Sequence, residues 1–542
     1  MDEKEDSAFS NEEPDGHVEY RYIDFDTPLP LEVQQHLNSQ GPEKRKRLRH
    51  DNIRSPQNMS KWRRITVSWM CYIASGLASH AASGYSPARE QLSAYWNIGN
   101  VATLVGITMF TTGFALAPMA LAPLSEVNGR KPVFIGTGLL FVVCQLCCGL
   151  TRSYPGMLLA RFFAGVGSST YSSMVGGVIS DIYRPEERNT PMALFSCTAL
   201  FGIGTGAIAS GFTAQYTTWR WIFYSQAIVD GVFVALLILL FPETRASVLL
   251  RWKAAEFNAL HEEMERAARL SSSPATTTTT TSDPPSPPSP PTRIRWRSEQ
   301  DEQQRGSLAA TITTSLTRPF HLLLTETVAF FFSLWAAFAW ATLYVALAAV
   351  PLVFSTTHAF TLAQSNAVFA AMCAGAVVIT PVSIYQERWA RQRGLIPHND
   401  APPPEARLYF SCVESALLPA GLFLFGWTAA GRGDADDVHW VVPVLAVGVA
   451  TMGVFSVYLA VFNYLSDAYG RFASSALAAQ SFCRNGLGGV LTLVTRRMFV
   501  DMGYGAAGSC LGGVALALTM VPWVLVLYGE RIRARSKFVG SL

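Results

Sequence analysis

Residues 124–132 read LSEVNGRKP, a charged turn that directly follows a long apolar run. The second half of the chain carries a related string, QERWAR at 386–391, after another apolar run. A second pair also repeats, because SDIY at 180–183 and SDAY at 466–469 each end an apolar run. Such repetition predicts a membrane protein built from two related helical bundles, a construction common in transporters.

Composition also indicates a membrane protein. Half of the 542 residues are hydrophobic and only 15% are charged, a balance outside the range of soluble globular domains. A stretch of about twenty apolar residues suffices to cross about 30 Å of hydrocarbon as a helix. Twelve such stretches lie at 65–83, 101–122, 132–150, 155–180, 191–213, 219–241, 326–354, 360–384, 408–430, 440–464, 474–496 and 505–528.

The predicted fold class is an all-α integral membrane protein, with twelve transmembrane helices in two pseudo-symmetric six-helix bundles. Lys and Arg in the short loops concentrate on the side that carries the N-terminus, so the positive-inside rule predicts that both termini are cytoplasmic. The linker between the bundles is expected to hold a helical piece at 251–270. The expected segments are a disordered cytoplasmic tail at 1–60, an N-terminal six-helix bundle at 61–245, a cytoplasmic linker with a Thr/Pro/Ser-rich stretch at 246–317, a C-terminal six-helix bundle at 318–530 and a basic cytoplasmic tail at 531–542.

Other protein classes find little support in the sequence. The nine cysteines fall in apolar spans without metal-ligand spacing to histidines, so neither a metal site nor a disulfide framework is expected. No histidine cluster, Ser/His/Asp arrangement or cofactor motif indicates an enzyme. The basic run at 44–49 could be a nuclear signal or a contact with anionic lipid, and in a protein with twelve spans the juxtamembrane contact is favoured. No nucleic-acid partner is expected.

Charged residues at the ends of the repeated apolar runs are candidates for a cytoplasmic latch. Asp181, at the end of the fourth run, is a natural partner for Arg130 in the turn after the second. Such a pair would form in one conformation and open in another. Asp467 would take the same role in the second half, against Arg388, Arg391 or Arg471. The full set of gating candidates is Glu126, Gly129, Arg130, Lys131, Asp181, Glu387, Arg388, Arg391, Asp467 and Arg471.

Three charged residues inside the apolar runs are candidates for proton coupling. Arg161 lies in the fourth run, where a cation costs about 2.5–3.5 kcal/mol on insertion scales and should face the bundle interior; the alternative is snorkelling to the outer interface. Asp230 lies near the middle of the sixth run, and Glu414 lies about two turns into the ninth. A buried carboxyl group can carry a proton between the two sides, although either acid could equally be structural.

Polar, aromatic and glycine residues mark three further runs. The fifth run contains GIGTGAIASG at 202–211, whose glycines permit close helix approach. A dinucleotide-binding loop also uses spaced glycines, but it requires a preceding strand. The aromatic residues of the seventh run could line the substrate cavity or pack against neighbouring helices, namely Trp335, Trp340 and Tyr344. The eleventh run adds a polar interior patch of further cavity candidates, namely Gln480, Arg484 and Asn485.

With these residues in hand, the chain resembles the major facilitator superfamily, and within it the twelve-span drug:H+ antiporter branch of the fungal type. The resemblance covers about residues 60–540. Its marks, in order along the chain, are LSEVNGRKP (124–132), ARFFAGVGSS (160–169), WRWIFY (219–224) and YLSDAYGRFASSALAAQS (464–481).

The resemblance implies roles for particular residues. The turn at 124–132 matches the family's cytoplasmic gating turn, with Glu126 in place of the usual Asp. Arg161 matches the span 4 motif that takes part in proton coupling. The antiporter motif in span 5 is matched by Gly202, Gly206 and Gly211, and the chain departs from that motif at Ala207 and Ser210.

The sequence thus predicts a secondary active transporter, multi-pass and monomeric, in the plasma membrane. Its partners would be a small organic substrate, protons and the lipid bilayer, and it would need no cofactor beyond the proton gradient. By alternating access it would export drugs, toxins or secondary metabolites. A polyamine or organic-acid (dicarboxylate) transporter of the same family is the first alternative, and a signalling transceptor is the alternative from another class.

Overall fold

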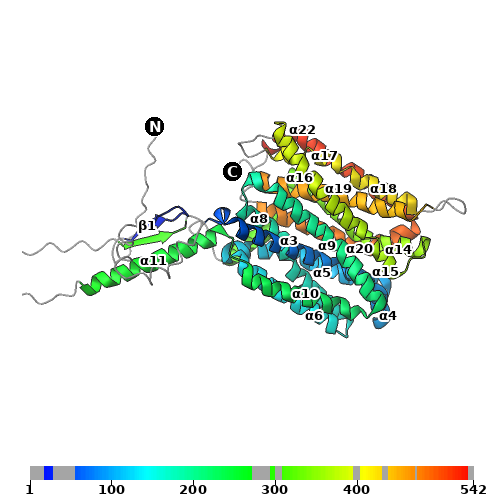
Figure 1. Cartoon of the computed structure of the whole chain (residues 1–542), viewed down its shortest axis with the longest axis horizontal. Helices are drawn as coiled ribbons and strands as arrows, with labels where there is room; N and C mark the ends of the chain where they lie inside the picture. The colour runs from blue at the N-terminus through cyan, green and yellow to red at the C-terminus, as the bar shows by residue number, and fades with distance from the viewer. Residues whose placement is uncertain are drawn as a thin grey trace, which may run out of the picture. The chain divides into compact units, whose positions relative to one another are not determined.

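The computed structural model describes residues 18–28, 55–271, 293–298, 308–394, 403–429, 438–469 and 473–534, and most of them are helical (Figure 1). The chain divides into two compact units. The small unit comes from residues 1–59 and 243–308, and the large unit comes from residues 60–242 and 309–542.

The first half of the large unit begins with α3 (Lys61–Ser83), which packs along α9 (Asn189–Tyr216). A short 3-10 turn, η3 (Ser86–Ala88), and another, η4 (Pro185–Glu187), connect its helices. The helices are α3 (Lys61–Ser83), α4 (Arg89–Trp96), α5 (Asn100–Asn128), α6 (Arg130–Leu150), α7 (Tyr154–Ser173), α8 (Val175–Ile182), α9 (Asn189–Tyr216) and α10 (Trp219–Leu240).

The second half of the large unit contains longer helices and more interruptions. Its elements are α13 (Leu308–Thr325), α14 (Thr327–Thr357), α15 (Leu362–Ala367), α16 (Ala370–Gln392), the 3-10 turn η5 (Pro404–Leu408), α17 (Ser411–Glu414), α18 (Leu417–Ala429), α19 (Val441–Tyr469), α20 (Ala473–Asp501), α21 (Tyr504–Leu518) and α22 (Met520–Ala534).

Each of the twelve apolar runs coincides with one helix or with successive short helices. Within the described residues, nine helical segments are long and apolar enough to cross a membrane. The other three runs fall on α3, on α7 with α8, and on α20, whose apolar character is diluted by polar side chains such as Ser75, Arg161 and Arg484. These side chains are buried against neighbouring helices, so the polar residues face protein rather than lipid.

The two halves of the large unit meet through two sets of helices. α5 of the first half packs along α20 of the second, and α9 packs along α15, α16 and α19. Gly489 allows the first contact, because a Cβ there would collide with Thr111 Oγ1. Gly204 allows the second, where a Cβ would lie 3.0 Å from the backbone oxygen of Phe369. Small residues thus let the helix backbones approach closely.

The small unit joins two distant pieces of sequence. β1 (Val18–Tyr22) pairs in parallel with β2 (Arg293–Arg297), and α11 (Ala246–Ser271) packs on β2. Their core contains Ile23, Ala254, Phe257 and Trp296. The Lys253 ammonium donates to the carbonyl oxygens of residues 24, 25 and 27, at 2.8–3.0 Å. These contacts tie the segment after β1 to α11.

The small unit corrects one expectation from the sequence. The tail at 1–60 is not disordered throughout, because residues 18–22 form β1. This strand finds its hydrogen-bond partner in β2, about 270 residues later, so local composition gave no sign of it. The expected helical piece at 251–270 is present and begins earlier, at Ala246. The Thr/Pro/Ser-rich stretch and most of the two tails lie outside the described residues.

Candidate functional site

The turn between α5 and α6 places one arginine against a carboxylate. Gly129 has a φ of 100°, which favours glycine, and it ends α5 directly before α6. Arg130 is 4% exposed; its Nε donates to Asp181 Oδ2 at 3.2 Å and its Nη1 to Ser125 Oγ at 2.8 Å. The pairing of Arg130 with Asp181 is therefore confirmed. Gly177 leaves room for the guanidinium, since a Cβ there would lie 2.7 Å from Nη2.

Two other residues of this turn, Lys131 and Glu126, lie near Arg130 in the sequence. Lys131 donates from Nζ to the carbonyl oxygen of Ile238, at the end of α10, at 3.2 Å. Glu126 is partly buried in the last turn of α5. The turn thus connects the ends of α5, α6, α8 and α10 within the first half.

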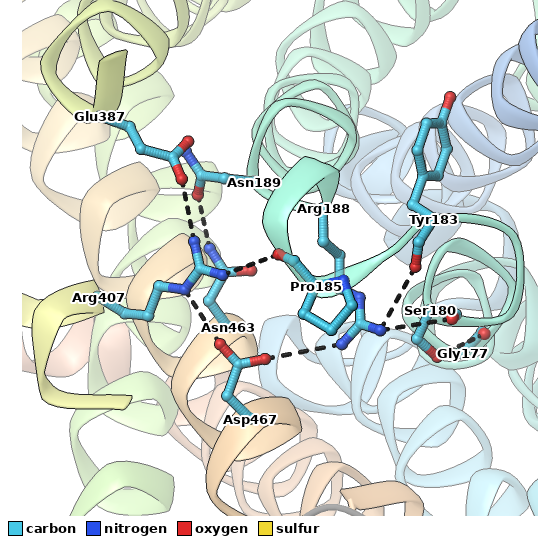
Figure 2. Close-up of polar contacts among 10 residues, drawn as sticks. All are labelled: Gly177, Ser180, Tyr183, Pro185, Arg188, Asn189, Glu387, Arg407, Asn463 and Asp467. Carbon is cyan, nitrogen blue, oxygen red and sulfur yellow. Dashed lines mark hydrogen bonds and ion pairs between the residues drawn. The ribbon is translucent and has the colours of Figure 1, made fainter. Parts of the chain in front are cut away.

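Arg407 is the centre of the corresponding polar group in the second half (Figure 2). Its Nε donates to Asp467 Oδ2 at 3.0 Å, and its Nη1 donates to Glu387 Oε1 at 3.2 Å. Arg391 shares Glu387, with its Nη2 at 2.8 Å from the same oxygen. The Arg407 side chain is only 6% exposed, so these ion pairs are screened less than surface pairs.

The polar group around Arg407 also contacts residues of the first half. Arg188, between η4 and α9, approaches Asp467 Oδ1 with its Nη1 at 3.6 Å (Figure 2). Burial lowers the pKa of Arg188, and Asp467 partly opposes this effect. Three hydrogen bonds also cross between the halves: Arg407 Nη2 to Pro185 O at 3.2 Å, Arg391 Nη2 to Glu186 O at 2.7 Å and Asn463 Nδ2 to Asn189 Oδ1 at 2.8 Å. We call Arg188, Glu387, Arg391, Arg407 and Asp467 the latch cluster.

The latch cluster corrects the predicted partner of Asp467. The sequence offered Arg388, Arg391 or Arg471, whereas the carboxylate pairs with Arg407 and Arg188. Arg391 binds Glu387 on its own helix, one turn earlier, and Arg388 is exposed. Arg471 lies outside the described residues. Arg407 could have been suspected from its place in a basic loop that mirrors the turn at 124–132.

A small, partly open cavity adjoins the latch cluster. Glu414 lines it together with Glu387 and Arg407 of the latch cluster, and with Asn189 and Asn463. Glu414 is thus the predicted coupling acid that shares a cavity with the latch cluster. Asn189 of the first half and Asn463 of the second both line this cavity. A change in the charge of Glu414 would therefore act where the two halves meet.

Arg161 is fully buried inside the first half. Its Nε donates to Gly106 O at 3.3 Å and its Nη1 to Ala81 O at 3.4 Å. The guanidinium lies 4.3 Å from the ring centre of Phe110 and 5.0 Å from that of Tyr85. With no exposed surface, the side chain does not reach the outer interface as the snorkelling alternative requires.

Asp230 is also buried, at 2% exposed, on α10. Its Oδ2 has no hydrogen-bond partner in the described part of the chain. Tyr171 on α7 interacts electrostatically with it. The structure therefore places Asp230 within the first half, and Glu414 beside the contact between the halves.

The span 5 glycines lie on two sides of α9. Gly202 and Gly206 face α3, where added Cβ atoms would collide with the backbone oxygens of Gly76 and His80. Gly211 faces α15, and a Cβ there would lie 2.5 Å from Asn366 Cβ. Two of these glycines thus pack within the first half and one packs against the second.

The predicted cavity residues separate into two groups. Arg484 lies over the rings of Trp340 and Tyr458, with Gln480 one helical turn before it on α20. Tyr344, also buried, interacts electrostatically with Arg484. The other two residues do not join them: Trp335 packs against Phe332, and Asn485 donates to Ser481 of its own helix.

Contacts between the halves also exist far from the latch cluster. Gln215, at the opposite end of α9 from Asn189, accepts from Ala363 N at 2.6 Å. Ser86 donates to Leu347 O at 2.9 Å. These hydrogen bonds are neutral, whereas those of the latch cluster involve charged groups. The two halves are thus joined at both ends of α9.

Two helical halves, each with a charged turn, that meet around buried polar residues define a membrane transporter of the two-bundle class. The family model of the Major Facilitator Superfamily matches residues 68–493, and the chain belongs to this family. It is therefore a multi-pass membrane transporter and not an enzyme.

Named relatives agree with this assignment. The MFS-type efflux pump MFS2 of Trichophyton rubrum is 28% identical over 490 residues, covering 90% of this chain and 76% of the pump. The multidrug transporter mdrA of Aspergillus fumigatus is 29% identical over 489 residues, covering 90% of this chain and 74% of mdrA. The xylose transporter XylE of E. coli, in a partially occluded inward-open conformation, superposes with a TM-score of 0.55 at 13% identity, covering 86% of this chain and 99% of XylE. This last likeness shows the fold alone.

Proposed function

We propose that the chain is a proton-coupled antiporter of the plasma membrane, which exports drugs, toxins or secondary metabolites by alternating access. Both termini would be cytoplasmic, and the latch cluster would close the cytoplasmic end. Export of such compounds is supported by the relatives named as an efflux pump and a multidrug transporter. A monomer is sufficient for this cycle, since both halves lie in one chain.

The observation that carries the proposal is the latch cluster. It joins the halves through charged side chains that can separate without unfolding any helix. At the other end of α9 the halves are joined by neutral hydrogen bonds. Opening one end while the other stays closed is the movement that alternating access requires.

Proton coupling is supported by the position of Glu414. The carboxylate shares its cavity with Arg407 and Glu387. A negative charge on Glu414 attracts Arg407, and protonation removes that attraction. Proton binding therefore changes the balance of charge beside the latch cluster, and Asp230 provides another acid, buried within the first half.

Reconstitution into proteoliposomes tests this proposal. Substrate and dye panels are loaded, a pH gradient is imposed, and efflux is followed with and without an ionophore that collapses the gradient. Gradient-dependent movement of at least one compound is expected. Movement that continues unchanged after collapse would remove the proton claim. In cells, equal accumulation of every compound with and without the protein would count against export.

A further inference from the structure

Arg484 carries a buried charge that the described protein leaves without an acceptor. Its side chain has no exposed surface, and none of its three guanidinium nitrogens has a hydrogen-bond partner among the described residues. An ionised group taken out of water without a counter-charge costs several kcal/mol. Such an arrangement persists where a second molecule supplies the missing charge.

The surroundings of Arg484 meet only part of this need. Its guanidinium carbon lies 4.5 Å from the ring centre of Trp340 and 5.1 Å from that of Tyr458. The two rings are themselves 4.9 Å apart, at 30°. Ring faces stabilise a cation, but they do not accept the hydrogen bonds that a guanidinium directs in its own plane.

Two neighbours of Arg484 also have unused polar atoms. Gln480 is fully buried one turn earlier on α20, and both its amide nitrogen and its amide oxygen lack partners in the described part of the chain. The Tyr458 hydroxyl on α19 is likewise without one. Together these three side chains offer several N–H and O–H donors beside two aromatic rings.

The location fits a substrate site. α20, which carries Arg484 and Gln480, packs against α14 of its own half and α5 of the other. Substrate sites of two-bundle transporters lie where the repeats meet. Arg484 and Gln480 have no exposed surface in this conformation, and Tyr458 and Trp340 are buried, so a ligand would enter when the halves separate.

We propose that Arg484, Gln480 and Tyr458 bind the carboxylate of an organic acid, whose apolar body packs on Trp340. A planar carboxylate accepts two parallel hydrogen bonds from one guanidinium. A polyamine would instead meet a fixed positive charge. The inference rests on the proposed transport function and gives it a substrate class, namely organic anions.

Ligand binding to the purified full-length protein tests this site without requiring transport. The probes are benzoate, its neutral isostere benzamide and the cation benzylamine, with tryptophan fluorescence as the readout. Wild-type protein should bind benzoate at least about tenfold more tightly than benzamide, as charge-assisted hydrogen bonds predict. Arg484→Gln should remove this preference. Equal benzoate binding by wild type and Arg484→Gln, or a preference for benzylamine, would overturn the inference.

Arg220→Gln is the matched control. Arg220 also lies over a tryptophan and a tyrosine, 4.4 Å from Trp219 and 4.8 Å from Tyr95, but it is on α10 and only partly buried. This variant should keep the benzoate preference. Loss of the preference in both variants would indicate a general effect of removing an arginine, and would also overturn the inference.

Gln480→Glu provides a variant that does not remove the charge. Its carboxylate would lie four residues before Arg484 on the same helix, where the two can pair. Thermal stability should rise, and benzoate affinity should fall about tenfold or more as the internal acid competes. Unchanged stability with unchanged benzoate binding would show that Arg484 already has a partner.

Two further outcomes separate related explanations. In one, chloride binds at saturation and benzoate added afterwards no longer changes the fluorescence. The site would then bind a halide and not an organic acid, which would overturn the proposal. Protein that binds benzoate through Arg484 but moves no compound in proteoliposomes would keep this site and refute the proposed transport function.

Discussion

Arg407 shows how a single side chain can join two halves of a transporter. Its planar fork reaches two carboxylates of its own half, Asp467 and Glu387, and a backbone carbonyl of the other half at Pro185. Lysine has a single ammonium group and cannot make these three contacts with the same geometry. The latch cluster therefore depends on arginine in particular.

Replacing Arg407 should weaken the closed state at this end. Arg407→Gln removes two ion pairs of a largely buried group, and we expect transport to fall about tenfold or more, with Arg407→Lys in between. Transport rates in proteoliposomes measure this. Arg393→Gln, which removes an exposed arginine at the end of α16, is the control and should transport normally. Normal transport by Arg407→Gln would exclude the latch role.

The half-buried Glu414 and the buried Asp230 predict different effects. Glu414→Gln should leave the fold intact and flatten the dependence of transport on pH, because Glu414 shares its cavity with the latch cluster. Asp230→Asn should impair coupling less, since Asp230 lies within the first half. Initial rates across a pH series in proteoliposomes distinguish the two. A pH profile unchanged in Glu414→Gln would make that residue a structural acid.

Individual residues were predictable where they belong to a repeated string. Asp181 and Arg130 lie in such strings, and their ion pair is present. Arg407 lies in a basic loop that mirrors the turn at 124–132, but it is outside the matched strings themselves. Several arginines of the second half could have paired with Asp467, and only the folded chain shows that α16, η5 and α19 bring Arg407 to it. The sequence likewise could not show that Arg484 lacks a hydrogen-bond acceptor, because this depends on every side chain that surrounds it in the fold.

At the scale of elements, α9 is a helix built for contact on more than one side. Gly206 lies against the backbone of α3, and Gly204 lies against α16. The length of the apolar run predicted the range of this helix well, as it did for the other spans. Run length could not predict the division of the fourth span at Met174 or of the twelfth at Thr519, because both halves of each span remain apolar.

An alanine at Gly206 should destabilise the protein. Its Cβ would collide with the backbone oxygen of His80, which cannot rotate away, and overpacking of this kind costs about 1–3 kcal/mol. Thermal unfolding in detergent measures the effect. The control is Gly136→Ala on α6, where a Cβ meets nothing within 4 Å. Alanine there should be neutral or slightly stabilising. Equal unfolding temperatures for both variants would contradict the close approach of α9 and α3.

At the scale of the whole molecule, the proposed cycle predicts that the halves separate near Asn189 and Asn463. These amides are 2.8 Å apart across the contact. In a background without the native cysteines, Asn189→Cys with Asn463→Cys should form a disulfide on oxidation. We expect oxidation to abolish transport and reductant to restore it, because a cross-linked end cannot open.

A second cysteine pair controls for the oxidation itself. Thr137 and Thr170 have hydroxyl oxygens 2.8 Å apart, but both belong to the first half. A disulfide between cysteines at these positions should leave transport intact. Transport that survives the first cross-link would show that the two halves need not separate at this end.

The strand pairing in the small unit limits how the chain threads through the bilayer. β1 precedes the first span and β2 follows the sixth, yet their backbones are hydrogen-bonded to each other. Two strands can pair only if they share one aqueous compartment. The number of crossings between them must then be even, a parity that six spans satisfy and that five or seven would violate.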